Sequence, residues 1–238
     1  MGLFLNHDDC GDIVIPLGGV QLQIINTLTN IFFVVAGLLH VKRARSAEAR
    51  QSGVFLLAVA FFSAFYHATS LWGGFIIDIV SMSVWCAHVG ITAQAIREAL
   101  GFNPMCRGEI RLGASACAVA LAVCGPILAF EAFDAGPVTT WNIWANSFTV
   151  LIVVAVLPAL LAILRAGLLP HFVWHIAFAI GLILVGAVFT QLIHLVCVTG
   201  YFTAFPLHSA WHVCSAGSAY ITIAVCDKGL TEAGKKSQ

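Results

Sequence analysis

Charge is scarce in this sequence of 238 residues. Only 9% of its residues are Asp, Glu, Lys or Arg, whereas a typical soluble domain has roughly 25%. Because 60% of the residues are hydrophobic, a soluble fold of this length could not bury them all in one core, which excludes an ordinary soluble globular protein. The formal net charge is zero, so the sequence also lacks the positive excess typical of a nucleic-acid-binding protein.

What the sequence has instead is a series of long apolar runs. A helix crosses a bilayer in roughly 20 residues, and seven runs approach or exceed that length: 19–41, 53–71, 74–98, 111–130, 141–165, 171–196 and 205–227. They lack the short alternation of apolar and polar residues typical of membrane β-barrels. We therefore predict an all-α integral membrane bundle of seven transmembrane helices. It forms a single domain over residues 1–238, with a short acidic N-terminal tail (1–18) and a basic C-terminal tail (228–238).

Lysine and arginine are missing from every second loop of this arrangement. With seven spans, one side carries Lys42, Arg43, Arg45, Arg50, Arg97, Arg107, Arg111, Arg165, Lys228, Lys235 and Lys236. The other side has only acids among its charged residues: Asp8, Asp9, Asp12, Glu131 and Asp134. The positive-inside rule then places the N-terminus outside and the C-terminus in the cytoplasm. This sidedness needs an odd number of spans, which supports seven.

Ionisable residues inside membrane spans are costly and usually functional. The predicted spans contain His40, His67, Asp78, His88, His175, His194, His208 and His212. Any single histidine among them could simply form a hydrogen bond to a neighbouring helix. The direction of each span separates them, since His67 ends the second span and Asp78 begins the third. His208 and His212 begin the seventh span, so these four residues share one depth in the outer half of the bundle.

Two spacings of four residues place these groups on shared helix faces. Ser63 precedes His67 by one turn, and His208 precedes His212 by one turn. Two histidines from one helix and one from another can supply three nitrogens to Zn²⁺ with a fourth position left for water, which the ion activates as a nucleophile. Asp78 could accept or orient the proton of that water. Ser63 could donate a hydrogen bond to a developing oxyanion.

His171 and His175 have the same spacing as His208 and His212. Their depth differs, because they begin the sixth span at the cytoplasmic side, far from His67. With Trp174 between them, they are predicted to form an interfacial pair.

Several of these motifs together resemble the alkaline ceramidase family. They are Ser63-Ala-Phe-Tyr-His67, Asp78, and His208-Ser-Ala-Trp-His212 in the last span, with Asn26-Thr27-Leu28-Thr29-Asn30 in the first. The family belongs to a superfamily of seven-span hydrolases that also includes adiponectin-type receptors. The outside N-terminus is similar to the orientation of the ceramidases and opposite to that of the receptors.

The resemblance implies a zinc ion held by His67, His208 and His212. It implies that Asp78 accepts a proton and that Ser63 stabilises the oxyanion. The expected reaction is hydrolysis of the amide bond of ceramide, or of a related membrane lipid, to a sphingoid base and a fatty acid.

Two further features come with the resemblance. Ceramidases of this type bind Ca²⁺ through acidic residues before the first span and a glutamate within it. The matching positions here are Asp8, Asp9, Asp12 and Gln23, so they could form a calcium site or, since glutamine replaces the glutamate, remain a merely acidic tail. The family also implies a disulfide between Cys10 and Cys197, whereas the cysteines inside the spans are expected to act as small apolar residues.

Alternative functions remain open at this point. A receptor-like seven-span protein with a structural zinc site would carry the same histidines, and only turnover distinguishes it from an enzyme. A haem protein would leave Ser63 and Asp78 without a role, and the sequence shows no inverted repeat typical of a transporter. Short loops and the lack of an N-glycosylation sequon favour a bacterial inner membrane. Lys235-Lys236 resembles a retrieval signal for the endoplasmic reticulum, so in a eukaryote we expect the endoplasmic reticulum or Golgi membrane.

Overall fold

The computed structural model describes residues 12, 14–17, 20–99, 169–199 and 207–236. Their elements, in chain order, are β1 (Val14–Leu17), β2 (Val20–Gln23), α1 (Ile24–Thr29), α2 (Ile31–Arg43), α3 (Ala47–Thr69), α4 (Trp72–Ala99), α7 (Leu169–Thr199) and α8 (Leu207–Lys236). The predicted fourth and fifth spans lie outside the described residues. Nearly all of the described chain is helical, which confirms the predicted class.

Four segments of the described chain are long and apolar enough to cross a membrane: Ile24–Arg43, Ala47–Thr69, Gly73–Thr92 and Phe172–Phe189. The first combines α1 and α2, because Asn30 between them keeps helical angles of φ −64° and ψ −13°. These four helices indicate a membrane-embedded protein, as the sequence predicts. The count of seven spans and the outside N-terminus stay predictions.

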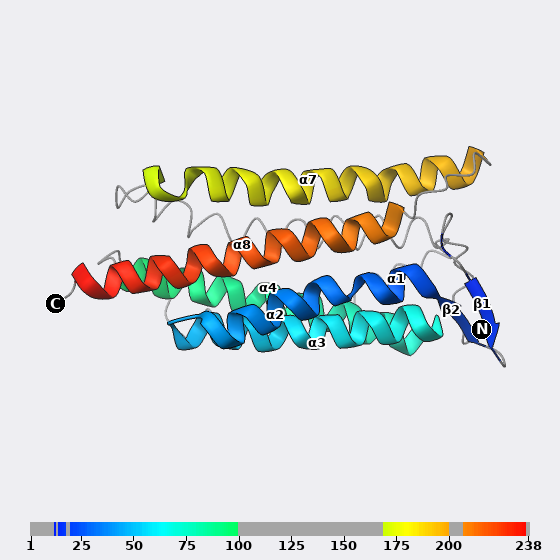
Figure 1. Cartoon of the computed structure of the whole chain (residues 1–238), viewed down its shortest axis with the longest axis horizontal. Helices are drawn as coiled ribbons and strands as arrows, with labels where there is room; N and C mark the ends of the chain where they lie inside the picture. Colours follow the sequence, from blue (N-terminus) through cyan, green and yellow to red (C-terminus); the bar gives the residue numbers. More distant parts are fainter. Residues whose placement is uncertain (1–11, 13, 18–19, 100–168, 200–206, 237–238) are drawn as a thin grey trace, which may run out of the picture.

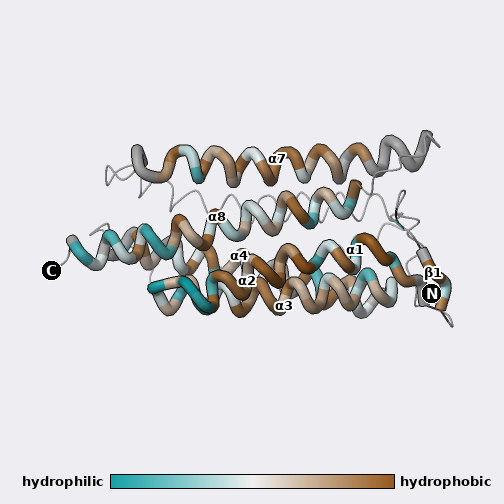
Figure 2. The backbone as a smooth tube through the Cα atoms, in the orientation of Figure 1, coloured by the Kyte–Doolittle hydropathy of each residue, from teal (hydrophilic) through white to brown (hydrophobic). Residues whose placement is uncertain are grey.

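Helix α8 lies between α7 and the group formed by α1 to α4 (Figure 1). It contacts α7 along one side and α2 and α4 along the other. Its colouring in Figure 2 is paler than the strongly hydrophobic stretches of α1 and α2. At 30 residues, α8 is about 45 Å long, which is sufficient to span a bilayer. Its more polar composition suits its central position, where neighbouring helices shield it from lipid.

The predicted start of the first span, at residue 19, is wrong. Residues Val20–Gln23 form β2, which pairs antiparallel with β1 from Val14↔Gln23 to Leu17↔Val20. Between the strands stands Gly18-Gly19, a dipeptide that favours a tight hairpin connection. The predicted tail 1–18 therefore contains a strand.

Helix α1 begins at Ile24 because Asp12 binds its free amides. The Asp12 carboxylate accepts hydrogen bonds from the backbone N–H groups of Ile25 and Asn26, at 2.8 and 3.1 Å. A carboxylate at this position satisfies amides that have no partner within the helix and interacts favourably with the helix dipole. The hairpin and Asp12 together hold Gln23 at the entrance of the first helix.

Close packing of α2 on α3 depends on two glycines. A Cβ atom on Gly37 would lie 2.8 Å from Cγ of Leu57, and one on Gly53 would lie 2.9 Å from the carbonyl oxygen of Gly37. Small residues of this kind let membrane helices approach each other closely. After α3, Ser70 adopts a left-handed conformation with φ 50°, so the chain reverses and α4 begins at Trp72.

At the opposite end of the bundle, α8 is tied to the loop before α3. The Asp227 carboxylate accepts hydrogen bonds from the backbone N–H of Arg45 at 3.1 Å, and from the backbone N–H and hydroxyl of Ser46, both at 2.7 Å. The Ser46 hydroxyl oxygen also caps α3 by accepting from the N–H of Ala49. This bond network fixes the basic α2–α3 loop beside the C-terminal part of α8, as the charge pattern predicts.

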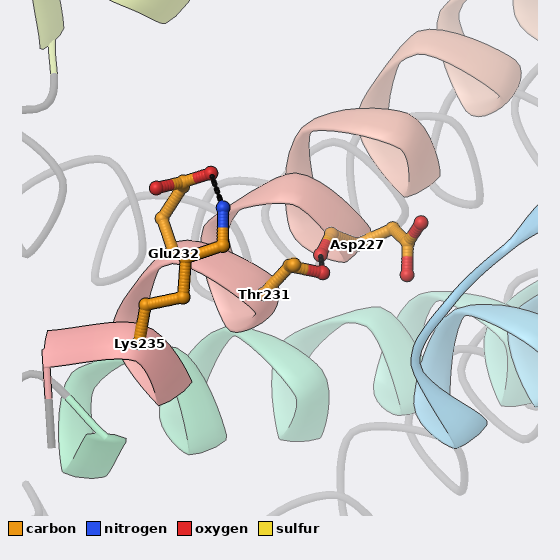
Figure 3. A network of polar contacts seen from close by, with 4 residues as sticks. All are labelled: Asp227, Thr231, Glu232 and Lys235. Atoms are coloured by element: carbon orange, nitrogen blue, oxygen red, sulfur yellow. Dashed lines mark hydrogen bonds and ion pairs between the residues drawn. The ribbon is translucent and has the colours of Figure 1, made fainter. Parts of the chain in front are cut away.

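The same stretch of α8 carries two local contacts that leave the Asp227 carboxylate free to bind the loop (Figure 3). The Thr231 hydroxyl donates to the Asp227 backbone carbonyl at 2.8 Å. Lys235 donates to the carboxylate of Glu232 at 2.9 Å, and both of these side chains are exposed.

Replacing Asp227 with alanine is expected to destabilise the protein by about 1–3 kcal/mol, because a charged acceptor of three amide and hydroxyl donors is lost. The effect should appear as a lower apparent melting temperature in detergent. Glu232→Ala is the matched control, since it removes a carboxylate of the same helix whose exposed ion pair contributes little. Equal melting temperatures for the two variants would show that the hydrogen bonds of Asp227 to the α2–α3 loop do not stabilise the protein.

Candidate metal centre

Three histidines meet at the end of the bundle that carries the hairpin. His67 lies near the end of α3, and His208 and His212 occupy the first turns of α8. Their ring centroids are 4.9 Å apart for His67 and His208, 5.0 Å for His67 and His212, and 4.8 Å for His208 and His212. One ring nitrogen of each lies within 4.8 Å of the others. Nitrogens around a tetrahedral zinc are about 3.3 Å apart, so small ring movements would complete the site.

Hydrogen bonds orient two of these rings. Nδ1 of His67 lies 2.6 Å from Oε1 of Gln23, and Nδ1 of His212 lies 2.9 Å from the hydroxyl of Thr29. With Nδ1 of each ring next to an oxygen atom, Nε2 is the atom that could bind an ion. Metal-binding histidines typically have such oxygen partners on the second ring nitrogen, so the residues present fit a metal ion.

The chemistry of the donors indicates which kind of ion they suit. Three imidazole nitrogens without a carboxylate favour a borderline ion such as Zn²⁺, whereas Ca²⁺ and Mg²⁺ prefer oxygen ligands. Three protein ligands also leave a fourth position open, which is typical of catalytic rather than structural zinc sites.

Ser63 and Asp78 lie in the same place as the histidines. Both are buried, and both line a cavity of about 20 Å³ that His67, His208 and His212 also line. The Ser63 hydroxyl interacts with the Asp78 carboxyl group. Oδ1 of Asp78 is buried and has no hydrogen-bond partner within the described part of the chain. Because a buried oxygen without a partner is costly, Asp78 is suited to bind a further molecule in this cavity.

A second, apolar cavity of about 60 Å³ adjoins the first. The two share the lining residues Phe33, Val59, Met82 and Trp211. From there the apolar cavity continues between α3, α4 and α8 as far as Val89. An apolar chain lying in it would place its polar end among the histidines.

The other histidines of the described chain have different surroundings. Nε2 of His40 lies 2.9 Å from the carbonyl oxygen of Tyr220, and Nε2 of His88 lies 3.2 Å from that of Glu48. Both therefore fit the structural interpretation of a histidine bound to a neighbouring helix. His175 is exposed on α7, and its interfacial position stays a prediction. The side chains of His171 and His194 lie outside the described residues.

The predicted calcium site and disulfide are only partly covered by the structure. Asp8, Asp9 and Cys10 lie outside the described residues, as does the side chain of Cys197. Asp12 binds the amides of α1 and Gln23 binds His67. Both features stay predictions. Cys86, Cys214 and Cys226 are buried free thiols, as expected for cysteines that act as small apolar residues.

Several polar residues around the site were not assigned their roles from the sequence. The resemblance suggests Gln23 only as a calcium ligand, and the sequence does not predict the hydrogen bonds of Asn26, Thr29 and Ser209. One signal was present, because Gln23, Asn26 and Asn30 recur every three or four residues at the start of an apolar segment. This spacing predicts a polar stripe on one helix face, and Asn26 and Asn30 are indeed buried.

Neither a scan against protein-family models nor a search of curated proteins finds a match for the chain. The function of the site must therefore be inferred from its residues and their geometry.

Proposed function

We propose that this chain is a zinc-dependent hydrolase of the membrane, which cleaves the amide bond of ceramide or a related lipid to a sphingoid base and a fatty acid. The observation that carries the proposal is the convergence of His67, His208 and His212 with Ser63 and Asp78 in one cavity. Three nitrogen ligands, a carboxylate oxygen that has no partner among the described residues and a hydroxyl are the groups that metal-assisted hydrolysis needs.

In this proposal His67, His208 and His212 hold the zinc ion, which supplies Lewis-acid activation of water and of the carbonyl group. Oδ1 of Asp78 accepts the proton of the attacking water, since it lies in the cavity and has no partner among the described residues. Ser63 donates a hydrogen bond to the carbonyl oxygen as negative charge develops on it.

A lipid substrate is supported by the adjoining apolar cavity. Its lining residues, such as Phe33, Val59 and Met82, also line the histidine cavity. The first few carbons of an acyl chain could therefore enter this cavity while the amide reaches the histidines. The resemblance to the alkaline ceramidases supports the choice of an amide. The position of the site, at the end that the charge pattern places outside, suits a bond close to a lipid headgroup.

Purified protein tests the proposal directly. Metal analysis should find about one zinc per chain. With ceramide in mixed micelles, mass spectrometry should detect a sphingoid base and a fatty acid in equal amounts. A zinc chelator should abolish both products, and added Zn²⁺ should restore them. Calcium added separately tests the predicted calcium site.

Two results would contradict the proposal in different ways. Stoichiometric zinc without turnover of any lipid amide or ester would favour a receptor-like protein with a structural zinc site. Undiminished hydrolysis by protein without metal would exclude the zinc mechanism itself.

A further inference from the structure

The hydrogen bond between His67 and Gln23 is the last in a series of side-chain hydrogen bonds that begins at Ser209. The Ser209 hydroxyl on α8 donates to Oδ1 of Asn26 at 2.7 Å. Nδ2 of Asn26 on α1 donates to Oε1 of Gln23 at 3.2 Å. The same Oε1 lies 2.6 Å from Nδ1 of His67. None of these four side chains is more than 4% exposed, so water cannot easily replace their bonds.

The donor and acceptor roles in this series of hydrogen bonds determine which ring nitrogen of His67 carries the hydrogen. Because Oδ1 of Asn26 accepts from Ser209, its NH₂ group faces Gln23 and donates. The amide oxygen of Gln23 can only accept. Nδ1 of His67 must therefore be the donor, which leaves the lone pair of the neutral ring on Nε2.

Thr29 binds His212 in a similar manner. Its hydroxyl lies 3.0 Å from the carbonyl oxygen of Ile25 and 3.1 Å from that of Asn26, one turn earlier in α1. When the single hydroxyl hydrogen is donated to these carbonyls, the Thr29 oxygen accepts from Nδ1 of His212 at 2.9 Å. The end of β2 and the start of the first span thus provide oxygen partners for two of the three histidines.

We propose that Gln23, oriented by Asn26 and Ser209, is a positioning residue that keeps His67 in the Nδ1–H tautomer and presents its Nε2 to the metal before the ion binds. This inference rests on the proposed metal site. The neutral amide does this without adding a buried charge, which would need a partner of its own.

Gln23→Leu keeps a side chain of similar size but removes the acceptor. Zinc affinity should then fall by about 10–100-fold, the usual cost of losing the oxygen partner of a metal-binding histidine. Gln23→Glu restores an acceptor oxygen and should keep the affinity at or above that of the wild type. Thr27→Ala is the matched control. It removes a hydrogen bond to the Gln23 backbone carbonyl, at 2.6 Å, but leaves the Gln23 side chain in place. It should leave zinc affinity unchanged.

The tautomer can be measured without metal or substrate. In metal-free protein with ¹⁵N-labelled histidine, at a pH of about 8 where imidazoles are neutral, ring-nitrogen NMR shifts distinguish the two tautomers. His67 is assigned by comparison with His67→Ala. The wild type and Gln23→Glu should show Nδ1–H, and Gln23→Leu should show a mixture. Affinity is measured by competition with a coloured zinc chelator.

An Nε2–H tautomer in the wild type, or wild-type affinity in Gln23→Leu, would overturn the inference. Wild-type protein that binds no zinc would instead refute the proposed function. The tautomer of the metal-free protein would still decide the role of Gln23, and this measurement on the wild type does not depend on whether a variant folds.

Discussion

His212→Ala is expected to abolish zinc binding and lipid hydrolysis while the bundle stays folded. The substitution removes one of three ligands that lie within 4.8 Å of one another, and two histidines cannot hold the ion in the same geometry. The loss should exceed the roughly 10–100-fold that accompanies removal of an outer hydrogen-bond partner. Zinc content is measured by elemental analysis of purified protein, and products are measured by mass spectrometry.

His175→Ala is the matched control for this experiment. His175 is exposed on α7 and does not belong to the histidine cluster, so its removal should leave zinc content and turnover at wild-type values. His88→Ala provides a second comparison, because it removes a hydrogen bond to the Glu48 carbonyl and should lower stability without releasing zinc. Zinc retained by His212→Ala would show that the cluster is not the metal site.

The site could be located from the sequence because two periodic signals coincide there. The distribution of Lys and Arg predicts the direction of each span, and the predicted directions place His67, Asp78 and His208 at one depth. The four-residue spacing then puts His208 and His212 on one helix face. The structure brings the three histidines together, and both signals depend only on helix geometry and charge.

The hairpin and the partners of the histidines were not predictable in the same way. Val20–Gln23 is apolar enough to continue a span, and an apolar run alone does not distinguish a short strand from the start of a helix. The Gly18-Gly19 pair was the available turn signal. The bonds of Thr29 to His212 and of Ser209 to Asn26 each join residues 183 positions apart, so they depend on how α1 packs on α8.

The histidines outside the site illustrate a further limit of prediction from the sequence. His40 and His67 are both buried, yet one binds a backbone carbonyl of α8 and the other belongs to the histidine cluster. Residue type and burial are the same in the two cases. What distinguishes them is the part of α8 that each one contacts: His40 contacts the backbone carbonyl oxygen and the ring of Tyr220, whereas His67 contacts the imidazoles of His208 and His212.

Asp78→Asn is expected to lower hydrolysis by about 10²–10⁴-fold, the usual contribution of a general base, and to leave zinc bound. Asparagine has the same shape as aspartate, and its amide oxygen can still accept from Ser63. It cannot take the proton of an attacking water. The measurement compares turnover with zinc content in the same preparation, so a defect in metal binding is recognised directly.

Asp78→Asn should lower the rate of hydrolysis but should not lower the stability of the protein. Asp78 is buried with an unpaired Oδ1 among the described residues, and a buried carboxylate without full pairing costs free energy. Asparagine removes the buried negative charge, so the melting temperature of metal-free Asp78→Asn should equal or exceed that of the wild type. A residue kept for catalysis typically shows this opposition between stability and activity. Full turnover by Asp78→Asn would assign proton transfer to another group, and a large fall in melting temperature would show that Asp78 mainly holds the bundle together.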